Sequence, residues 1–306
     1  MSPGFDKLKL VGHQTALSKF DEKMSASIGT ALTDAARTLQ ANGIDEPRLD
    51  AGLLMSHVIG RDRAFIVAHT EAAIAEQQLK QFEEFVARRA EGEPLQYITG
   101  HQEFFKLDFE VTPDVLIPRP ETELIVEAVL ELVHADTRLA FADIGTGSGC
   151  LAISILNEFQ QAHAIAIDTS ERALHVARRN AARHCVADRL RLVQADLFAA
   201  ISVNDMFDLI VSNPPYVADD EIDRLPREVR REPRSALVAG PDGLSVIRRL
   251  IRDVPGHLRP GGHLIFEFGI NQDHEIHGLV NSEVWTTLEI RKDLQAIPRM
   301  MVLQKK

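Results

Sequence analysis

Two stripes of apolar residues at helical spacing mark the chain between Ser25 and Glu91. They consist of Leu32, Ala35, Ala36 and Leu39, and of Leu79, Phe82 and Val86. This i, i+3, i+4, i+7 spacing is typical of amphipathic helices whose apolar faces pack into a core. Turn residues at positions 42–43, 45–47 and 92–94 are expected to end the helices. Residues 25–92 are therefore predicted to form a small helical bundle.

The pattern changes after this bundle. Between Gln102 and Val111, aromatic and apolar positions alternate with polar ones. Such alternation is typical of a strand or hairpin, so residues 93–117 are predicted to be a linker that contains one. At the other end, residues 1–24 carry lysines but neither a continuous apolar stretch nor a small-residue cleavage site, so a flexible N-terminus is expected rather than a secretory signal.

Short apolar runs alternate with helical stretches from Leu139 onward. The runs are 139–144, 164–167, 190–193, 209–212 and 264–268. This rhythm predicts βαβ units and a parallel sheet. Residues 286–290 and 300–303 are expected to add two more strands, with helices covering both faces. Residues 118–306 are therefore predicted to be a doubly wound α/β domain of the Rossmann-like type.

Composition narrows the functional classes. The chain has 34 basic and 45 acidic residues, a net charge of −11, so its overall field repels phosphate backbones. We therefore expect a protein partner rather than direct nucleic-acid binding. No apolar run approaches the roughly 18 residues of a membrane span, so no membrane association is expected. Two distant cysteines, Cys150 and Cys185, suit a reducing cytoplasm and argue against a metal site.

A glycine-rich loop follows the first predicted strand of the α/β domain. It consists of Gly145, Thr146, Gly147, Ser148 and Gly149, and it opens the helical run 151–159. Its glycines allow a ligand to approach the backbone, and the helix N-terminus behind it favours a carboxylate or phosphate. A dinucleotide fingerprint would place its third glycine at position 150, where this chain has Cys150. A structural glycine turn is the alternative interpretation.

Acidic residues end the next two predicted strands. Asp168 is placed where a carboxylate can accept hydrogen bonds from both hydroxyls of a ribose, although it could instead cap the following helix. Asp196 and Leu197 follow the third strand, where a side chain and a backbone N–H could frame an adenine ring. The glycine loop and these acids share the carboxyl edge of the sheet, which is where open α/β sheets bind ligands.

The tetrapeptide Asn213-Pro214-Pro215-Tyr216 follows the fourth predicted strand. The two prolines fix φ and remove two N–H donors, so the loop is stiff and rich in acceptors. The Asn213 side-chain oxygen and the Pro214 carbonyl can each accept an N–H from a planar –NH₂ group, while Tyr216 offers an aromatic wall. A purely structural turn is the alternative.

With these motifs the chain resembles the protein-(glutamine-N5) methyltransferases, which act on peptide-chain release factors or on ribosomal protein L3. The resemblance runs from about Ser25 onward and includes 116–123, the glycine loop, the NPPY loop and 232–244. It implies that S-adenosyl-L-methionine is the cofactor and that residues 213–216 hold the glutamine. It also implies cofactor contacts from the glycine loop, Asp168, Leu197 and Asn213. Relatives often have tryptophan at the position of Leu197, so Phe198, Phe104 or Phe105 is considered as the residue that stacks on adenine.

Substrate choice stays open between three classes. Pro120 favours release factors, because the branch that modifies L3 typically has serine there. Adenine-N6 DNA methyltransferases share the tetrapeptide, since adenine also presents a planar –NH₂, but they would need a basic groove. A non-enzymatic dinucleotide-binding module is disfavoured by the early third glycine and by the NPPY sequence. The expected reaction is methylation of a release-factor glutamine in the cytoplasm.

Overall fold

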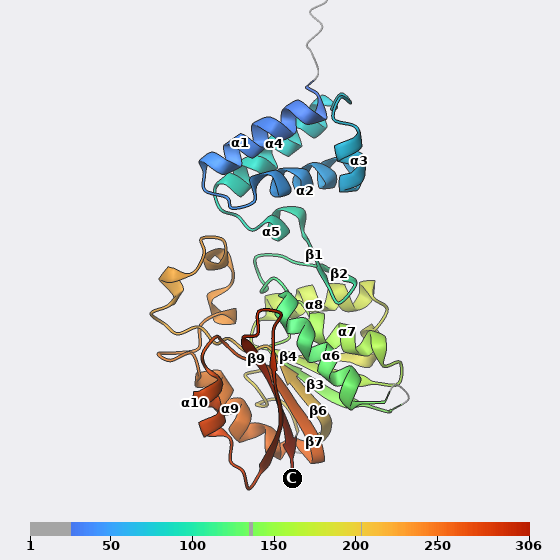
Figure 1. Ribbon diagram of the computed structural model, residues 1–306. Helices are drawn as coiled ribbons and strands as arrows, with labels where there is room; N and C mark the ends of the chain where they lie inside the picture. The colour runs from blue at the N-terminus through green and yellow to red at the C-terminus, as the bar shows by residue number, and fades with distance from the viewer. Residues whose placement is uncertain (1–25, 135–136, 203) are drawn as a thin grey trace, which may run out of the picture.

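The computed structural model describes residues 26–134, 137–202 and 204–306 (Figure 1). The predicted flexible N-terminus, residues 1–24, lies outside the described residues. The helical part begins with α1 (Ile28–Ala41), α2 (Pro47–Ile59), α3 (Arg63–Ala68) and α4 (Glu76–Ala90). Ser27 caps α1 by accepting a hydrogen bond from the Thr30 N–H, and α4 ends just before the predicted break at 92–94.

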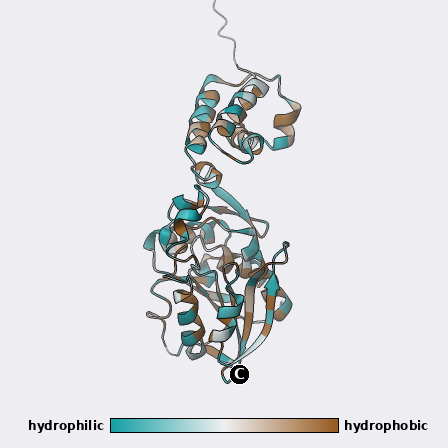
Figure 2. Ribbon diagram, turned by 60° about the vertical axis from the view of Figure 1, so that its left-hand side comes forward, coloured by the Kyte–Doolittle hydropathy of each residue, from teal (hydrophilic) through white to brown (hydrophobic). Residues whose placement is uncertain are grey.

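These four helices share one apolar core, as the helical spacing predicts. Ala35, Leu39, Phe82 and Val86 are buried in it, whereas Leu32 lies at its edge. Figure 2 shows hydrophilic and hydrophobic segments alternating along these helices, which stand at one end of the molecule. The predicted hairpin is present as β1 (His101–Phe104) and β2 (Leu107–Glu110). The linker also contains a short helix that the sequence pattern does not predict, α5 (Leu95–Thr99).

The remaining chain builds a seven-stranded sheet in the order β5-β4-β3-β6-β7-β9-β8. Its strands are β3 (Ala140–Ile144), β4 (His163–Asp168), β5 (Leu190–Gln194), β6 (Phe207–Ser212), β7 (Leu258–Glu267), β8 (Trp285–Lys292) and β9 (Pro298–Lys305). The first five are parallel. The two C-terminal strands were predicted, but they form antiparallel pairs, β9 with β7 and β8 with β9. The doubly wound α/β architecture is confirmed.

Helices cover both faces of this sheet (Figure 1). One face packs against α6 (Glu123–Leu132), α7 (Cys150–Glu158) and α8 (Glu171–Arg183), and the other against α9 (Ser245–Asp253) and α10 (Asp273–Leu279). Successive strand residues point to opposite faces, so Phe141 joins the first core and Ala142 the second. Because β4 and β6 flank β3, the chain changes direction beside β3, where open α/β sheets form their binding crevice.

Arginines join the helical part to the sheet-containing part. Arg227 donates to the backbone carbonyls of Asn42 and Ala90, and Arg231 donates to that of Glu91 at 2.6 Å. These carbonyls lie at the C-terminal ends of α1 and α4, where unsatisfied backbone oxygens favour a cation. The segment that carries both arginines therefore touches the helical bundle on one side and continues toward the crevice on the other. Within the described residues, no helix is both long and apolar enough to span a membrane.

Candidate active site

The glycine loop turns sharply between β3 and α7. Gly145, Gly147 and Gly149 all have positive φ, at +75°, +54° and +84°. A Cβ on Gly147 would meet nothing within 4 Å, so this backbone is open to the cavity. A Cβ on Gly149 would lie 2.9 Å from Ile153 and 3.2 Å from Ala177, so this glycine permits close packing of α7 against α8. The first two glycines line the cavity, whereas the third allows two helices to pack closely.

The buried carboxylate of Asp143 stabilises the glycine loop through hydrogen bonds. Asp143, at the end of β3, accepts hydrogen bonds from the Thr146 hydroxyl at 2.6 Å and from the Ala152 N–H at 3.3 Å. Burial raises the pKa of Asp143 to about 7, against the opposing effect of these hydrogen bonds. Its bonds link the strand, the loop and the first turn of α7, so the loop shape is built into the fold.

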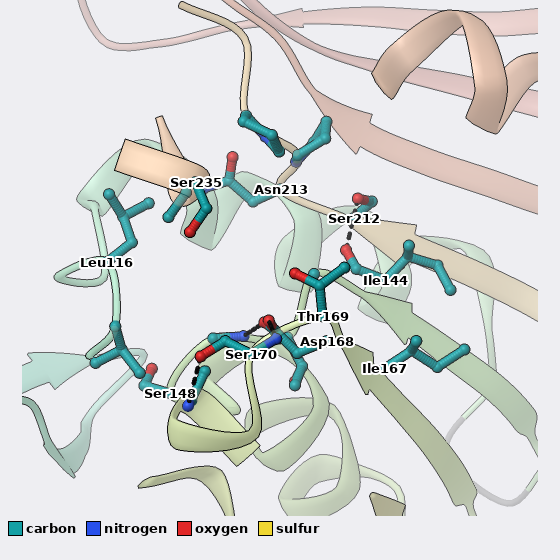
Figure 3. Close-up of a pocket in the computed structure, with 18 of the residues that line it drawn as sticks. Leu116, Ile144, Ser148, Ile167, Asp168, Thr169, Ser170, Ser212, Asn213 and Ser235 are labelled. Atoms are coloured by element: carbon teal, nitrogen blue, oxygen red, sulfur yellow. Dashed lines mark hydrogen bonds between the residues drawn. The ribbon is translucent and has the colours of Figure 1, made fainter. Parts of the chain in front are cut away.

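Asp168 lies at the end of β4 and faces the glycine loop (Figure 3). One carboxylate oxygen accepts the Gly147 N–H at 2.9 Å and the other accepts the Ser170 N–H at 2.8 Å. The helix-cap alternative is wrong, because Ser170 caps α8 by accepting from the Ala173 N–H. Burial raises the pKa of Asp168. Each carboxylate oxygen retains acceptor capacity for a ligand hydroxyl.

The third strand supplies a different wall of the cavity. Leu197 is buried, lines the cavity and has a positive φ of 51°. Asp196 also lines it, but its carboxylate pairs with Arg249 at 2.9 Å and its side chain is 59% exposed.

None of the three phenylalanines considered for adenine stacking lines the cavity. Phe198 stacks on His257 with ring centroids 4.3 Å apart, and Phe104 is buried against Phe109 in the first core. Phe105 packs against that same core. The cavity wall that includes Ile167 and Leu197 is therefore aliphatic rather than aromatic.

The NPPY loop approaches the same cavity from β6. Asn213, Pro214 and Pro215 line it, and Figure 3 shows Asn213 across the cavity from Asp168. The Asn213 Nδ2 donates to the Thr122 hydroxyl at 2.9 Å, while its Oδ1 is buried without a hydrogen-bond partner among the described residues. Tyr216 stands outside the lining, where its hydroxyl donates to Glu267 at 2.9 Å. An unpaired buried acceptor on a residue that lines the cavity indicates a place for a ligand donor.

Two residues beside Asn213 were missed by reasoning from the sequence. Thr122 lies between the Pro118-containing segment and α6, and its hydroxyl donates to Glu267 at 2.6 Å. Glu267 ends β7 and is only 2% exposed. Burial raises its pKa, although hydrogen bonds from Thr122 and Tyr216 oppose this. An acid that follows the apolar run 264–266 is the signal that could have identified Glu267.

An ion pair joins two segments at the mouth of the cavity. Glu232 is buried, accepts the Ile117 N–H at 3.0 Å and pairs with Arg119. It joins the segment before α6 to the segment whose Pro233 and Ser235 line the cavity. This pairing gives a physical reason for two of the motifs that carry the resemblance, 116–123 and 232–244.

The lining fits S-adenosyl-L-methionine. Open glycine backbone lies beside a carboxylate with spare acceptor capacity, which suits a ribose, and aliphatic side chains suit a purine. The orphaned Asn213 oxygen on the opposite wall leaves an acceptor for a second ligand.

Comparisons with known proteins agree with this architecture. A family model described as the PrmC N-terminal domain matches residues 30–100, and one described as the methyltransferase small domain matches residues 121–241. Among solved structures, the hMettl16 catalytic domain in complex with an RNA hairpin is 17% identical, with a TM-score of 0.52, and the match covers 76% of this chain and 82% of that one. At this identity the likeness concerns the fold.

Curated relatives match along nearly their whole length. The release factor glutamine methyltransferase of Koribacter versatilis is 42% identical over 276 residues, which is 90% of this chain and 97% of that relative. The protein of the same name from Nitratidesulfovibrio vulgaris is 40% identical, over 92% of this chain and 96% of that relative. The chain belongs to the release factor glutamine methyltransferase family.

Proposed function

We propose that this enzyme transfers a methyl group from S-adenosyl-L-methionine to the side-chain amide nitrogen of a release-factor glutamine, the one in the Gly-Gly-Gln motif of class-1 factors. The observation that carries the proposal is the buried, unpaired Asn213 Oδ1 in the NPPY loop, across the cavity from Asp168. The names of the curated relatives support the choice of substrate.

The cofactor would be held by the glycine loop, Asp168, Asp196, Leu197 and Asn213. When bound, it supplies a methyl group on a positively charged sulfur. The protein must compensate for a poor nucleophile, because the lone pair of an amide nitrogen is delocalised into its carbonyl. Asn213 Oδ1 and the Pro214 carbonyl would accept the two N–H groups, orient the nitrogen and stabilise the positive charge that develops on it.

Positioning supplies the other large contribution, since good alignment is worth on the order of 7 to 11 kcal/mol. The rigid Pro214-Pro215 pair keeps these acceptors in place without rearrangement. After methylation the nitrogen is acidic enough to lose a proton to water, so the mechanism requires no general base from the protein. Among the described residues, no group of three or more His, Cys, Asp and Glu side chains could hold a metal ion.

Asp168→Ala is expected to weaken cofactor binding by about 1 to 3 kcal/mol, because it removes a charged acceptor for the ribose. It also removes the acceptor for the Gly147 N–H, so the loop would lose a tether. Calorimetric titration with S-adenosyl-L-homocysteine measures the effect. Unchanged affinity would remove Asp168 from the cofactor site.

We infer that the helical bundle recognises the protein substrate, because the residues assigned to the cofactor and the amide all lie after Pro118. Replacing both Arg227 and Arg231 with alanine should leave cofactor affinity unchanged and raise KM for a whole release factor roughly tenfold, the equivalent of one charged hydrogen bond. The reason is that these arginines hold α1 and α4 against the segment that reaches the cavity.

The matched control replaces Arg224 and Arg230, which lie on the same segment and carry the same charge. Steady-state kinetics with whole release factor would compare the two double variants. Equal KM values for the variants and the parent enzyme would contradict a role for the bundle in substrate binding.

Labelled methyl transfer to purified release factors, ribosomal protein L3 and DNA in parallel tests the proposed substrate. We expect transfer to the release factor alone, mapped by mass spectrometry to the Gly-Gly-Gln glutamine. Labelling of L3 but not of the release factor would show the assignment to be wrong. Labelled DNA would point instead to adenine methylation.

A further inference from the structure

A chain of buried hydrogen bonds runs behind the NPPY loop. Glu267 accepts from the Thr122 hydroxyl at 2.6 Å through one oxygen and from the Tyr216 hydroxyl at 2.9 Å through the other. Thr122 in turn accepts from the Asn213 Nδ2 at 2.9 Å. These four residues come from three segments that are far apart in the sequence, so only the fold brings them together.

Each hydrogen bond in this series has a fixed donor and a fixed acceptor. A carboxylate only accepts hydrogen bonds, so the single hydroxyl proton of Thr122 must point to Glu267. The Thr122 oxygen can then only accept from Asn213. If the Asn213 amide were turned over, its oxygen would face an oxygen with no proton left to share. The nitrogen of Asn213 therefore faces Thr122 and its oxygen faces away.

We propose that Glu267 and Thr122 are positioning residues that hold Asn213 with its oxygen toward the substrate, and that they thereby select a primary amide over a carboxylate. A glutamine –NH₂ can donate to this oxygen. A glutamate side chain would place a second acceptor against it, and the buried Asn213 Oδ1 would stay unpaired. The choice of glutamine as substrate rests on the proposed function, whereas the orientation of Asn213 does not.

Glu267→Gln tests the direction of the chain while preserving the side-chain shape. The new amide still accepts from Tyr216 through its oxygen, but its nitrogen donates to Thr122. The Thr122 hydroxyl proton is then free to donate to Asn213, so the constraint on the Asn213 amide is lost and it can turn over and present its –NH₂ to the cleft. A substrate amide would meet a donor where it needs an acceptor.

We expect Glu267→Gln to lower kcat with the release factor by roughly 100-fold or more, comparable to losing one preorganised polar contact. Thr122→Val, which keeps the shape but removes the hydroxyl, should have a similar effect, and Thr122→Ser should recover most of the loss. Affinity for S-adenosyl-L-homocysteine, measured by calorimetry, should fall far less than kcat, because the glycine loop, Asp168 and Leu197 keep their place in the cavity lining. A merely structural role would lower cofactor affinity and turnover together.

A second measurement does not depend on the substrate. In protein labelled with ¹⁵N-asparagine, the Asn213 side-chain amide signal can be assigned by its loss in Asn213→Ser. In the parent enzyme one amide proton is bonded to buried Thr122 and should exchange slowly with solvent. In Glu267→Gln both protons should exchange quickly, since the amide then faces the cleft.

The outcomes separate the two proposals. If the parent enzyme methylates the release factor and Glu267→Gln does so equally well, the positioning role is wrong and the proposed function stands. If no release factor is methylated, the proposed function fails, and the exchange of the Asn213 amide still decides the orientation. Slow exchange in both proteins would overturn the inference.

Discussion

Asn213→Ala is expected to lower kcat for methyl transfer by about 10²- to 10³-fold, the typical effect of removing one preorganised polar group from a transition state. The Asn213 oxygen is one of two acceptors proposed for the reacting –NH₂, and it is the one that is buried and unpaired. Positive charge develops on the nitrogen only as the new bond forms, so the contact is stronger in the transition state than in the bound substrate. The loss should therefore appear in kcat more than in KM.

The fold should change little in this variant. Asn213 donates one side-chain hydrogen bond, to Thr122, and alanine there leaves Thr122 still bonded to Glu267. Asn180→Ala is the structural counterpart, because the fully buried Asn180 bonds to the backbone of Glu110 and of Ser148. We expect it to lower the melting temperature instead. Should Asn213→Ala lose melting temperature while kcat survives, the NPPY loop would be only a turn.

Much of the fold follows from local patterns. The four inner parallel strands each contain a short apolar run that is largely buried, as in 139–144, and such runs are visible without knowledge of distant partners. The helix α5 was not predicted because five residues between Pro94 and Gly100 are too few to show a period. The direction of β9 was also not predicted, because it depends on where the chain returns to the sheet rather than on the composition of the strand.

Some residues of the candidate site could likewise be predicted from local patterns, and others could not. The glycine loop, Asp168 and the NPPY loop are contiguous motifs at strand ends, so their spacing indicates a shared edge. Thr122 and Glu267 are separated by 145 positions, so no local pattern indicates that they join Asn213 in one series of hydrogen bonds. Tyr216 shows the same limit: the sequence suggests an aromatic wall, whereas in the fold its hydroxyl is bonded to buried Glu267.

A glycine outside the cavity lining is expected to support the conformation of the NPPY loop. Gly243 has a φ of +72°, and a Cβ at that position would lie 2.2 Å from the carbonyl oxygen of Tyr216 and 2.8 Å from the Gln272 side-chain nitrogen. Gln272 donates to that same carbonyl at 2.9 Å. The absence of a Cβ therefore allows the segment around Gly243 to pack directly against the backbone of the NPPY loop.

Gly243→Ala is expected to lower the free energy of unfolding by about 2 to 5 kcal/mol, the sum of the left-handed backbone cost and of overpacking. Gly43→Ala is a matched control, because Gly43 has nearly the same φ, +73°, and a Cβ there would meet nothing within 4 Å. It should cost only about 1 to 2 kcal/mol, the backbone contribution alone. Denaturant unfolding of both variants isolates the clash with Tyr216.

Because the clash displaces the Tyr216 carbonyl, Gly243→Ala should also lose turnover under conditions where it remains folded, and Gly43→Ala should not. Equal losses of stability in the two variants would show that a Cβ at position 243 causes no costly clash with the Tyr216 carbonyl.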